Sequence, residues 1–255
     1  MQAVILAAGK GSRLNDLTAD RPKCMIEIEG RSLIHRSLDA LAWAGFREVI
    51  LVTGYLADKL KAHVGERHGE LKIRTRHNQD YNETGSMMSL LAAVPDLDSP
   101  DFAIFESDLL FHRDFVAQTC ATQGDVILTA DISGSGDEVY VCADADGQLI
   151  FLGKNADAAQ RHDSPGEFAG ITIMSQGFLD RYRRMTQELI RRGERQYHYE
   201  EVIYLTARAG AFCRVEGPPG LPWTEVDTAA DLDRALAVIW PAIVSQDGAA
   251  PNAAG

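Results

Sequence analysis

The sequence predicts an α/β fold with a mixed, mostly parallel sheet that is flanked by helices. Three observations support this class. Short apolar runs alternate in the first half with longer segments of helical period. Apolar runs that do not alternate with polar residues are typical of parallel strands buried on both faces. In the second half the segment 138–154 alternates in polarity around Asp146-Gly147, which indicates a hairpin, so a mixed sheet is expected.

The first half contains expected strands joined by expected helices. The strands are 3–8, 48–54, 71–77 and 101–108, and the helices are 32–45, 56–69 and 85–94. A strand, a helix and a second strand in this order form a right-handed crossover with parallel strands. The carboxyl ends of such strands share one edge of the sheet, where ligands of these folds bind. The segments that follow the strands are therefore the first candidates for a site.

The second half adds further strands and three helices. Strands are expected at 125–131, 167–175, 211–217 and 223–227, with a hairpin over 138–154 and helices at 177–193, 199–210 and 228–244. Thr228 and Asp231 have the spacing of a capping box at the start of the last helix. Because no repeat or linker divides the chain, we expect a single domain over 1–244 and a flexible tail over 245–255.

Composition and charge exclude several classes of protein. The chain has 255 residues, 45% of them hydrophobic, which is enough for one large core. A formal net charge of −12 argues against general nucleic-acid binding, which needs a basic surface. No apolar run approaches the ~20 residues of a membrane span, and no signal-peptide pattern is seen. The scattered cysteines lack metal-ligand spacing and suit a reducing cytoplasm, so we expect a cytoplasmic protein. The apolar runs are too short for membrane insertion.

The segment "LAAGKGSRL" follows the first expected strand and suits phosphate binding. Gly9, Gly11 and Arg13 form G-x-G-x-R, which is neither the P-loop nor the dinucleotide fingerprint. Glycines let backbone N–H groups turn toward a phosphate chain, and Arg13 supplies a forked cation. Pro22 and Lys23 follow in "RPKCMIEI" and add a compact cation. From the residues alone, a plain turn and a solvated lysine are the alternative.

Together, "LAAGKGSRL" and "RPKCMIEIEGRSLIHRSLDAL" resemble the signature of nucleotidyltransferases with a glycosyltransferase-A-like, Rossmann-like fold, and the likeness extends to "EVDT". The resemblance implies that a nucleoside triphosphate is joined to a phosphorylated partner and pyrophosphate is released. Residues 1–131 would form the nucleotide-binding half and 132–244 the acceptor-binding half. The residues expected at the triphosphate are Ala8, Gly9, Gly11, Ser12, Arg13 and Lys23.

Two aspartates are the expected metal ligands. Asp108 follows an apolar strand, and Mg²⁺ typically binds one or two carboxylates together with phosphate oxygens. The family resemblance implies that Asp108 and the late Asp227 ligate Mg²⁺. The alternatives are a solvated loop acid for Asp108 and a helix-terminal carboxylate for Asp227. Glu106 and Glu225 stay open between a supporting role and the surface.

The region "RHNQDYNETGSMMSLLAA" is similar to cytidylyltransferases that act on phosphocholine or 2-aminoethylphosphonate. It lacks the P-x-G-x-A pattern of sugar-type members. The resemblance implies that CTP contacts Asn78, Asn82, Ser86 and Ser89, since N–H groups and hydroxyls at a helix start could read a cytosine edge. Ordinary capping of the helix by Thr84 or Ser86 is the alternative.

An acceptor with an amine is expected near "QYHYEEVI". Tyr199 and Glu200 could surround an ammonium group, and Glu138 could add a carboxylate. The resemblance places Lys154 and Glu167 near the acceptor as well. The alternatives are an amphipathic helix start for 199–201 and surface roles for the lysine and Glu167. The expected acceptor is a small amine-bearing phosphate or phosphonate.

Lys23, Arg13 and Lys154 are the expected catalytic residues, because nucleotidyl transfer depends on positioning and charge neutralisation and needs no covalent intermediate. Two alternatives stay open: a sugar-1-phosphate nucleotidyltransferase and a non-catalytic nucleotide-binding regulatory domain. The expected partners are CTP and the acceptor, with no nucleic acid. A homodimer is compatible with the sequence.

Overall fold

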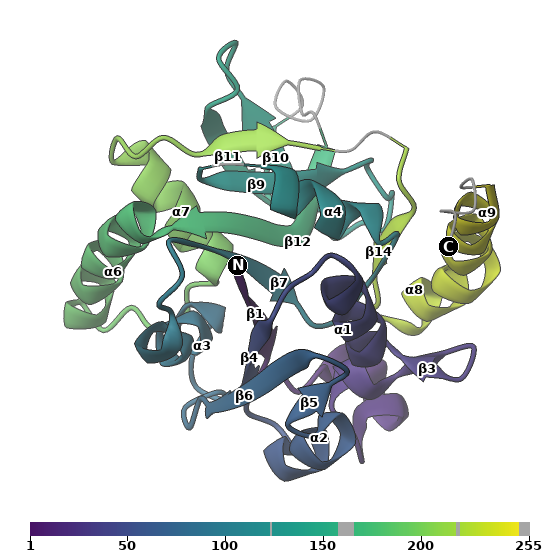
Figure 1. Cartoon of the computed structure of the whole chain (residues 1–255). Coiled ribbons are helices and arrows are strands. Elements are labelled where there is room, and N and C mark those ends of the chain that lie inside the picture. The colour runs from purple at the N-terminus through teal and green to yellow at the C-terminus, as the bar shows by residue number, and fades with distance from the viewer. Residues whose placement is uncertain (123, 158–165, 218–219, 250–255) are drawn as a thin grey trace.

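One mixed sheet forms the centre of the fold (Figure 1). A computed structural model describes residues 1–122, 124–157, 166–217 and 220–249. The central strands lie in the order β7, β1, β4, β6 and are parallel to one another; they span Asp101–Glu106, Gln2–Ala7, Glu48–Thr53 and Leu71–His77. All six residues of β1 are buried, as expected for a strand covered on both faces.

The second half of the chain extends this sheet with antiparallel strands. The strand β12 (Gly166–Ser175) pairs antiparallel with β7, and the hairpin of β10 (Tyr140–Ala143) and β11 (Leu149–Gly153) continues outward. The strand β9 (Val126–Ala130) pairs with β12 and with β13 (Arg214–Glu216). The predicted hairpin and mixed sheet are confirmed. Since β9 pairs with strands from beyond residue 131, that position does not divide the sheet.

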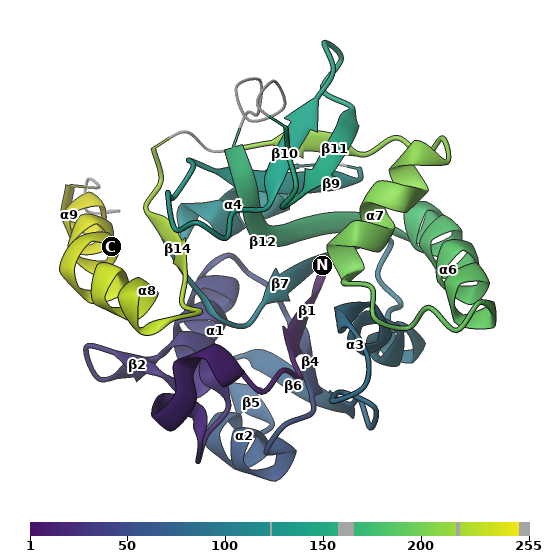
Figure 2. The same cartoon turned by 180° about the vertical axis from the view of Figure 1, so that it is seen from behind.

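Helices cover both faces of the sheet and create two main cores (Figures 1 and 2). On one face pack α1, α2 and α4, which span Leu33–Trp43, Ala57–Val64 and Asp114–Ala121. On the other pack α3, α6 and α7, which span Ser86–Ala93, Gln176–Arg191 and Tyr199–Arg208. Within the described ranges, no helix is long and apolar enough to cross a membrane.

The helix α6 illustrates how sequence pattern produces this packing. The side chain of Ser175 caps its first turn by accepting a hydrogen bond of 3.1 Å from the Phe178 backbone N–H. Its buried positions recur at helical spacing and are Phe178, Leu179, Tyr182, Thr186 and Leu189. The charged residues between them face solvent. The pattern therefore fixes both the start of the helix and the face that it buries.

A third, smaller core holds the C-terminal helical segment against the first part of the chain. It combines Leu14, Ile28 and Leu110 with Val226 and Ile243. The segment comprises α8 (Ala229–Arg234), a π-helical stretch over Ala235–Ile239 and α9 (Trp240–Ala249). The predicted capping box is confirmed, because Thr228 and Asp231 exchange hydrogen bonds.

Three sequence expectations about elements need correction. The tail was expected from 245, but α9 continues to Ala249; residues 250–255 lie outside the described residues. The helix expected over 56–69 ends at Val64, because Gly65 has a φ of +68° and redirects the chain into the short strand β5 (Arg67–His68). The helix α4 was not predicted.

At Gly85 the start of α3 packs closely against the segment before α7. A Cβ at this position would lie 2.1 Å from the backbone oxygen of Tyr197 and 2.3 Å from that of Gln196. Gly85→Ala is therefore expected to destabilise the fold by about 1–3 kcal/mol, since backbone must move to admit the methyl group. Urea unfolding measures the change. Gly177→Ala, whose Cβ meets nothing closer than 3.7 Å, is the matched control. Equal midpoints for the two variants would contradict the prediction.

Candidate active site

The loop after β1 packs directly on Lys23. Gly11 has a φ of +65°, and a Cβ there would lie 2.9 Å from the Lys23 Cβ. Glycine is thus needed at this position both for its backbone conformation and for the close approach. Pro22 is buried and precedes the 3₁₀ turn Lys23–Met25, which fixes the base of the lysine side chain. The two sequence motifs therefore form one structural unit.

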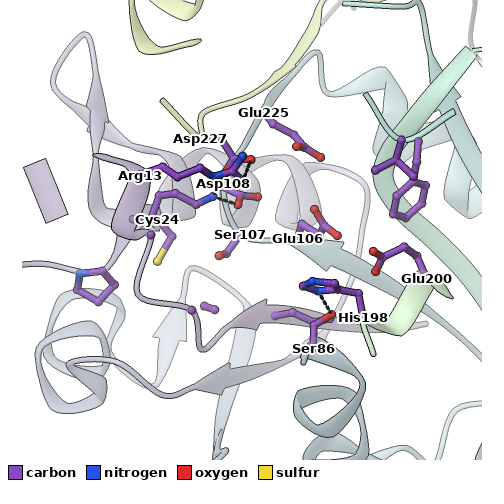
Figure 3. Close-up of a pocket in the computed structure, with 18 of the residues that line it drawn as sticks. Arg13, Cys24, Ser86, Glu106, Ser107, Asp108, His198, Glu200, Glu225 and Asp227 are labelled. Atoms are coloured by element: carbon purple, nitrogen blue, oxygen red, sulfur yellow. Dashed lines mark hydrogen bonds and ion pairs between the residues drawn. The ribbon is translucent and has the colours of Figure 1, made fainter. Parts of the chain in front are cut away.

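Two distant aspartates meet at the end of this lysine. The strands β8 (Leu109–Phe111) and β14 (Trp223–Glu225) pair antiparallel, and the Val226 N–H donates to the Asp108 carbonyl oxygen at 3.0 Å. This pairing brings Asp227 beside Asp108 (Figure 3). The Lys23 ammonium forms ion pairs with both carboxylates. The predicted convergence of Asp108 and Asp227 is confirmed.

The electrostatic balance at Lys23 favours its charged form. Burial alone would lower the pKa of Lys23, but the charges of Asp108 and Asp227 and their hydrogen bonds together raise it above its ordinary value. The side chains of this trio are only 14–16% exposed. The ion pairs are therefore little screened by solvent, and the ammonium is a permanent charge at neutral pH.

The Asp108 carboxylate has an oxygen that is free to bind a cation. The Asp108 Oδ1 atom is buried and has no hydrogen-bond partner. A carboxylate oxygen that is buried without a partner is costly unless something binds it. No cluster of three or more His, Cys, Asp or Glu side chains suited to a metal occurs in the described ranges. The pair Asp108 and Asp227 fits a hard ion that takes most of its remaining ligands from phosphate and water.

A second ion-pair network joins the two halves of the chain. The Arg13 guanidinium contacts Asp227 and Asp137, each at 2.5 Å, and Lys154 reaches Asp137 at 2.7 Å. Asp137 lies on the exposed segment between β9 and β10 and belongs to no motif that was recognised in the sequence. Sequence analysis missed this residue, and only its position within "SGDE" before a strand could have drawn attention to it. Asp137 thereby brings Arg13 and Lys154 together.

Except for Asp137, these groups line a cavity of about 300 Å³. Figure 3 shows Asp108 and Asp227 beside Arg13 at one end, and Glu200 at the other with Ser86 and His198 nearby. The residues that line it include Gly9, Gly11, Arg13, Lys23, Cys24, Ser86, Glu106, Ser107, Asp108, Val139, Lys154, Phe168, His198, Glu200, Glu225 and Asp227. The cavity thus runs from an ion-paired cluster of cations and aspartates to Glu200.

Three glutamates line the cavity, Glu106, Glu200 and Glu225. Burial raises the pKa of Glu106 and of Glu225, and neighbouring carboxylates raise both further. Burial also raises the pKa of Glu200 to about 8, to which Glu201 contributes while Lys154 opposes it. The Glu200 Oε2 atom is buried without a hydrogen-bond partner. Such a group is poised to accept a cationic ligand.

The residues expected to read cytosine divide into two groups. Ser86 lines the cavity; its hydroxyl accepts from the Tyr199 N–H at 2.9 Å and lies 3.4 Å from His198 Nδ1. The others do not line it. Asn78 donates to the Ser89 hydroxyl at 3.0 Å inside the protein, and Asn82 is exposed. The structure therefore gives Asn78 and Ser89 a role in holding the loop that leads into α3.

Several residues that were expected at the acceptor or the triphosphate lie outside the wall of this cavity. Tyr199 is fully buried and its ring lies 6.1 Å from that of Phe168, so it belongs to the core beneath the cavity. Glu138 accepts from the Gly136 N–H and does not line the cavity. Ala8 and Ser12 are likewise absent from its wall, although the flanking Gly9, Gly11 and Arg13 belong to it.

Glu167 faces a neighbouring cavity of about 280 Å³. Its carboxylate accepts from the Ser133 N–H at 2.7 Å and from the Ser133 hydroxyl at 3.2 Å. The two cavities share Arg13, Phe168, Glu225 and Asp227 among their lining residues. Glu167 therefore supports the segment that carries Asp137 and does not border the first cavity.

Cations and aspartates thus converge beyond the carboxyl ends of the parallel strands β1 and β7, an arrangement suited to a phosphate chain together with a divalent ion. The likeness to known proteins agrees with this class. The model of the MobA-like NTP transferase domain matches residues 3–196, and the chain belongs to this family of nucleotidyltransferases.

Two proteins with named activities are similar in sequence to most of this chain. The CMP-5'-(3-aminopropyl)phosphonate synthase of Streptomyces rubellomurinus is 30% identical over 240 residues, which cover 91% of this chain but 37% of that protein. The chain thus spans little more than a third of the length of that relative. The CTP:phosphoglutamine cytidylyltransferase of Campylobacter jejuni is 26% identical over 264 residues, covering 91% and 98% of the two chains.

A solved structure supports the fold. The inositol-1-phosphate CTP transferase from T. maritima superposes with a TM-score of 0.77 at 19% identity, over 98% of this chain and 97% of that chain. At this identity the likeness shows the fold alone. The predicted nucleotidyltransferase fold is thereby confirmed.

Glu200→Gln is expected to stabilise the fold at alkaline pH. A folded-state pKa of about 8 lies above the ordinary value of 4.5, so between these values only the folded state keeps the proton. The contribution of Glu200 to stability therefore falls as pH rises from about 4.5 to about 8. The melting temperature of the variant should exceed that of the wild type by about 3–8 °C at pH 8.5 and approach it near pH 4.

Thermal unfolding across this pH range measures the effect. Glu194→Gln, which alters an exposed carboxyl near the same segment, is the control and should follow the wild type. A Glu200→Gln variant that melts at or below the wild-type temperature at pH 8.5 would show that this carboxyl does not burden the fold.

Proposed function

We propose that this chain transfers a cytidylyl group from CTP to a small amine-bearing phosphate or phosphonate and releases pyrophosphate. The observation that carries the proposal is the meeting of Lys23 with Asp108 and Asp227 at one end of a cavity whose other end is formed by Glu200. The names of the two relatives, a CMP-aminopropylphosphonate synthase and a phosphoglutamine cytidylyltransferase, support this choice of nucleotide and acceptor class.

The nucleotide end of the cavity suits a triphosphate. Gly9 and Gly11 leave the backbone open toward the cavity, and Arg13 and Lys23 supply positive charge beside it. Of the predicted base-reading groups, only the hydroxyl of Ser86 at the start of α3 lines the cavity, on the wall toward Glu200. We propose that it contacts the cytosine.

Asp108 and Asp227 are the residues that would hold Mg²⁺. When bound there, the ion would neutralise charge that develops on the α-phosphate. The Lys23 ammonium lies between the same two carboxylates. Its long side chain can turn from the aspartates to a phosphate oxygen while remaining anchored at the loop.

The acceptor end suits a zwitterion. Lys154 would contact the phosphate or phosphonate, and Glu200 with Glu106 would contact the ammonium group. Phe168 and Val139 supply apolar surface between these charges. The raised pKa of Glu200 fits this role, because a bound cation lowers the cost of ionising it.

The reaction needs only positioning and neutralisation. An acceptor phosphate oxygen attacks the α-phosphorus of CTP, the bond to the bridging oxygen breaks, and pyrophosphate leaves with that electron pair. A phosphate monoester has its second pKa near ~6, so the attacking oxygen is already ionised at neutral pH. No base is required, and Arg13 and Lys23 hold the triphosphate in line.

A screen for pyrophosphate release tests the proposal directly. Each of the four nucleoside triphosphates is combined with phosphocholine, phosphoethanolamine, 2-aminoethylphosphonate, 3-aminopropylphosphonate, phosphoglutamine and hexose 1-phosphates. Release with CTP and an amine-bearing acceptor is expected. Release with sugar phosphates alone would identify a sugar-1-phosphate nucleotidyltransferase, and CTP binding without any release would identify a regulatory domain.

Lys23→Ala and Asp108→Ala are each expected to lower kcat at least about 100-fold, because the first removes a cation beside the reacting phosphates and the second removes a proposed ligand of Mg²⁺. Steady-state rates at saturating CTP and Mg²⁺ measure this, with circular dichroism as the test of folding. Lys59→Ala removes an exposed lysine and is the matched control. Rates near those of the wild type in either site variant would contradict the assignment.

A further inference from the structure

The cations that face the cavity are all paired with carboxylates of the chain itself. Lys23 pairs with Asp108 and Asp227, Arg13 with Asp227 and Asp137, and Lys154 with Asp137. Two of these carboxylates are the expected metal ligands. Asp137 is not an expected metal ligand, and it has no role in the proposed reaction.

We propose that the Asp137 carboxylate occupies the place of a ligand phosphate between Arg13 and Lys154, and that it must leave when a phosphate binds. It therefore sets the affinity of the site for phosphates. The inference rests on the proposed function, which makes Arg13 and Lys154 the residues that contact the nucleotide and the acceptor.

The geometry of the contact is that of a bridging anion. The Asp137 Oδ2 atom lies 2.5 Å from the Arg13 guanidinium, and its Oδ1 atom lies 2.7 Å from the Lys154 ammonium. One carboxylate thus presents a separate oxygen to each cation. A phosphate offers three such oxygens and about twice the charge, so it is the stronger partner for the same two groups.

The ion pairs of Asp137 are also the ones in the site that a bound phosphate can replace most easily. The side chains of Arg13, Asp137 and Lys154 are 43–52% exposed, whereas those of Lys23, Asp108 and Asp227 are 14–16% exposed. Exposed ion pairs contribute little to stability, typically ~0.2–1 kcal/mol each. Asp137 can therefore give up both partners at small cost.

The backbone around Asp137 gives it room to withdraw. Gly134 and Gly136 precede it with φ values of +70° and +87°, and Ser133 is held by Glu167 at the base of the segment. Asp137 lines the second cavity of about 280 Å³, beside the first. The carboxylate can move away from the phosphates without disturbing β10.

The test compares phosphate binding by Asp137→Asn and by the wild-type chain. Inorganic pyrophosphate is the probe, because it carries no base and its binding does not depend on the choice of nucleotide. Calorimetry in buffer that contains EDTA removes metal from the comparison. The loss of two exposed ion pairs predicts binding about 3- to 20-fold tighter in the variant.

Further measurements separate competition from a structural role. Affinity for pyrophosphate should decrease more steeply with salt in Asp137→Asn, since Lys154 then loses its internal anion and Arg13 keeps only Asp227. Asp137→Glu keeps the charge and should bind like the wild type. Asp131→Asn, an exposed aspartate of the same segment, is the matched control and should not change the affinity.

Equal or weaker binding by Asp137→Asn, with both proteins folded and melting alike, would overturn the inference and leave the proposed function intact. Absence of pyrophosphate binding by either protein would overturn the assignment of Arg13 and Lys154 to phosphates, and the inference with it. Tighter binding by the variant supports both.

Discussion

The short pairing of β8 with β14 is the contact on which the site depends. It sets Asp227, from near the end of the chain, beside Asp108, which follows a central strand. Two carboxylates this close repel each other, and the repulsion is tolerable only because Lys23 lies between them. Lys23 in turn needs Gly11, since a side chain there would collide with the lysine. The loop, the lysine and the two aspartates are therefore one electrostatic unit built from four separate parts of the sequence.

The three buried glutamates that line the cavity lower the stability of the fold. Glu106, Glu200 and Glu225 are held where burial disfavours their charge, and their raised pKa values show that the folded state keeps protons that the unfolded chain would lose. Apolar residues at these positions would remove that cost. The two cores on either face of the sheet supply the stability that lets the fold keep them. Carboxyls in such a place are typical of a functional site.

The sequence predicted the parts of this structure that local patterns determine. Strand polarity, the hairpin at Asp146-Gly147 and the capping box at Thr228 depend on neighbouring residues, and the meeting of Asp108 with Asp227 followed from a specific signature. Tyr199 was misplaced because the pattern defines a helix start but not which side chains of its first turn point inward; Glu200 faces the cavity and Tyr199 the core. A role for Asp137 could not be predicted from local patterns, because its two ion-pair partners lie 124 and 17 residues away in the sequence.

In the proposed reaction, the charges along the cavity would also determine how an acceptor enters it. Lys154 and Arg13 would attract a phosphate, and Glu200 and Glu106 would attract an ammonium, so a molecule with both groups would be favoured in one orientation only. That orientation would direct its phosphate toward the aspartates and the triphosphate, where the proposed reaction requires it. The raised pKa of Glu200 would add selectivity, because an ammonium stabilises the ionised form of this carboxyl and a neutral acceptor does not. On this proposal, the same buried carboxyls that destabilise the fold would discriminate between acceptors and orient the one that reacts.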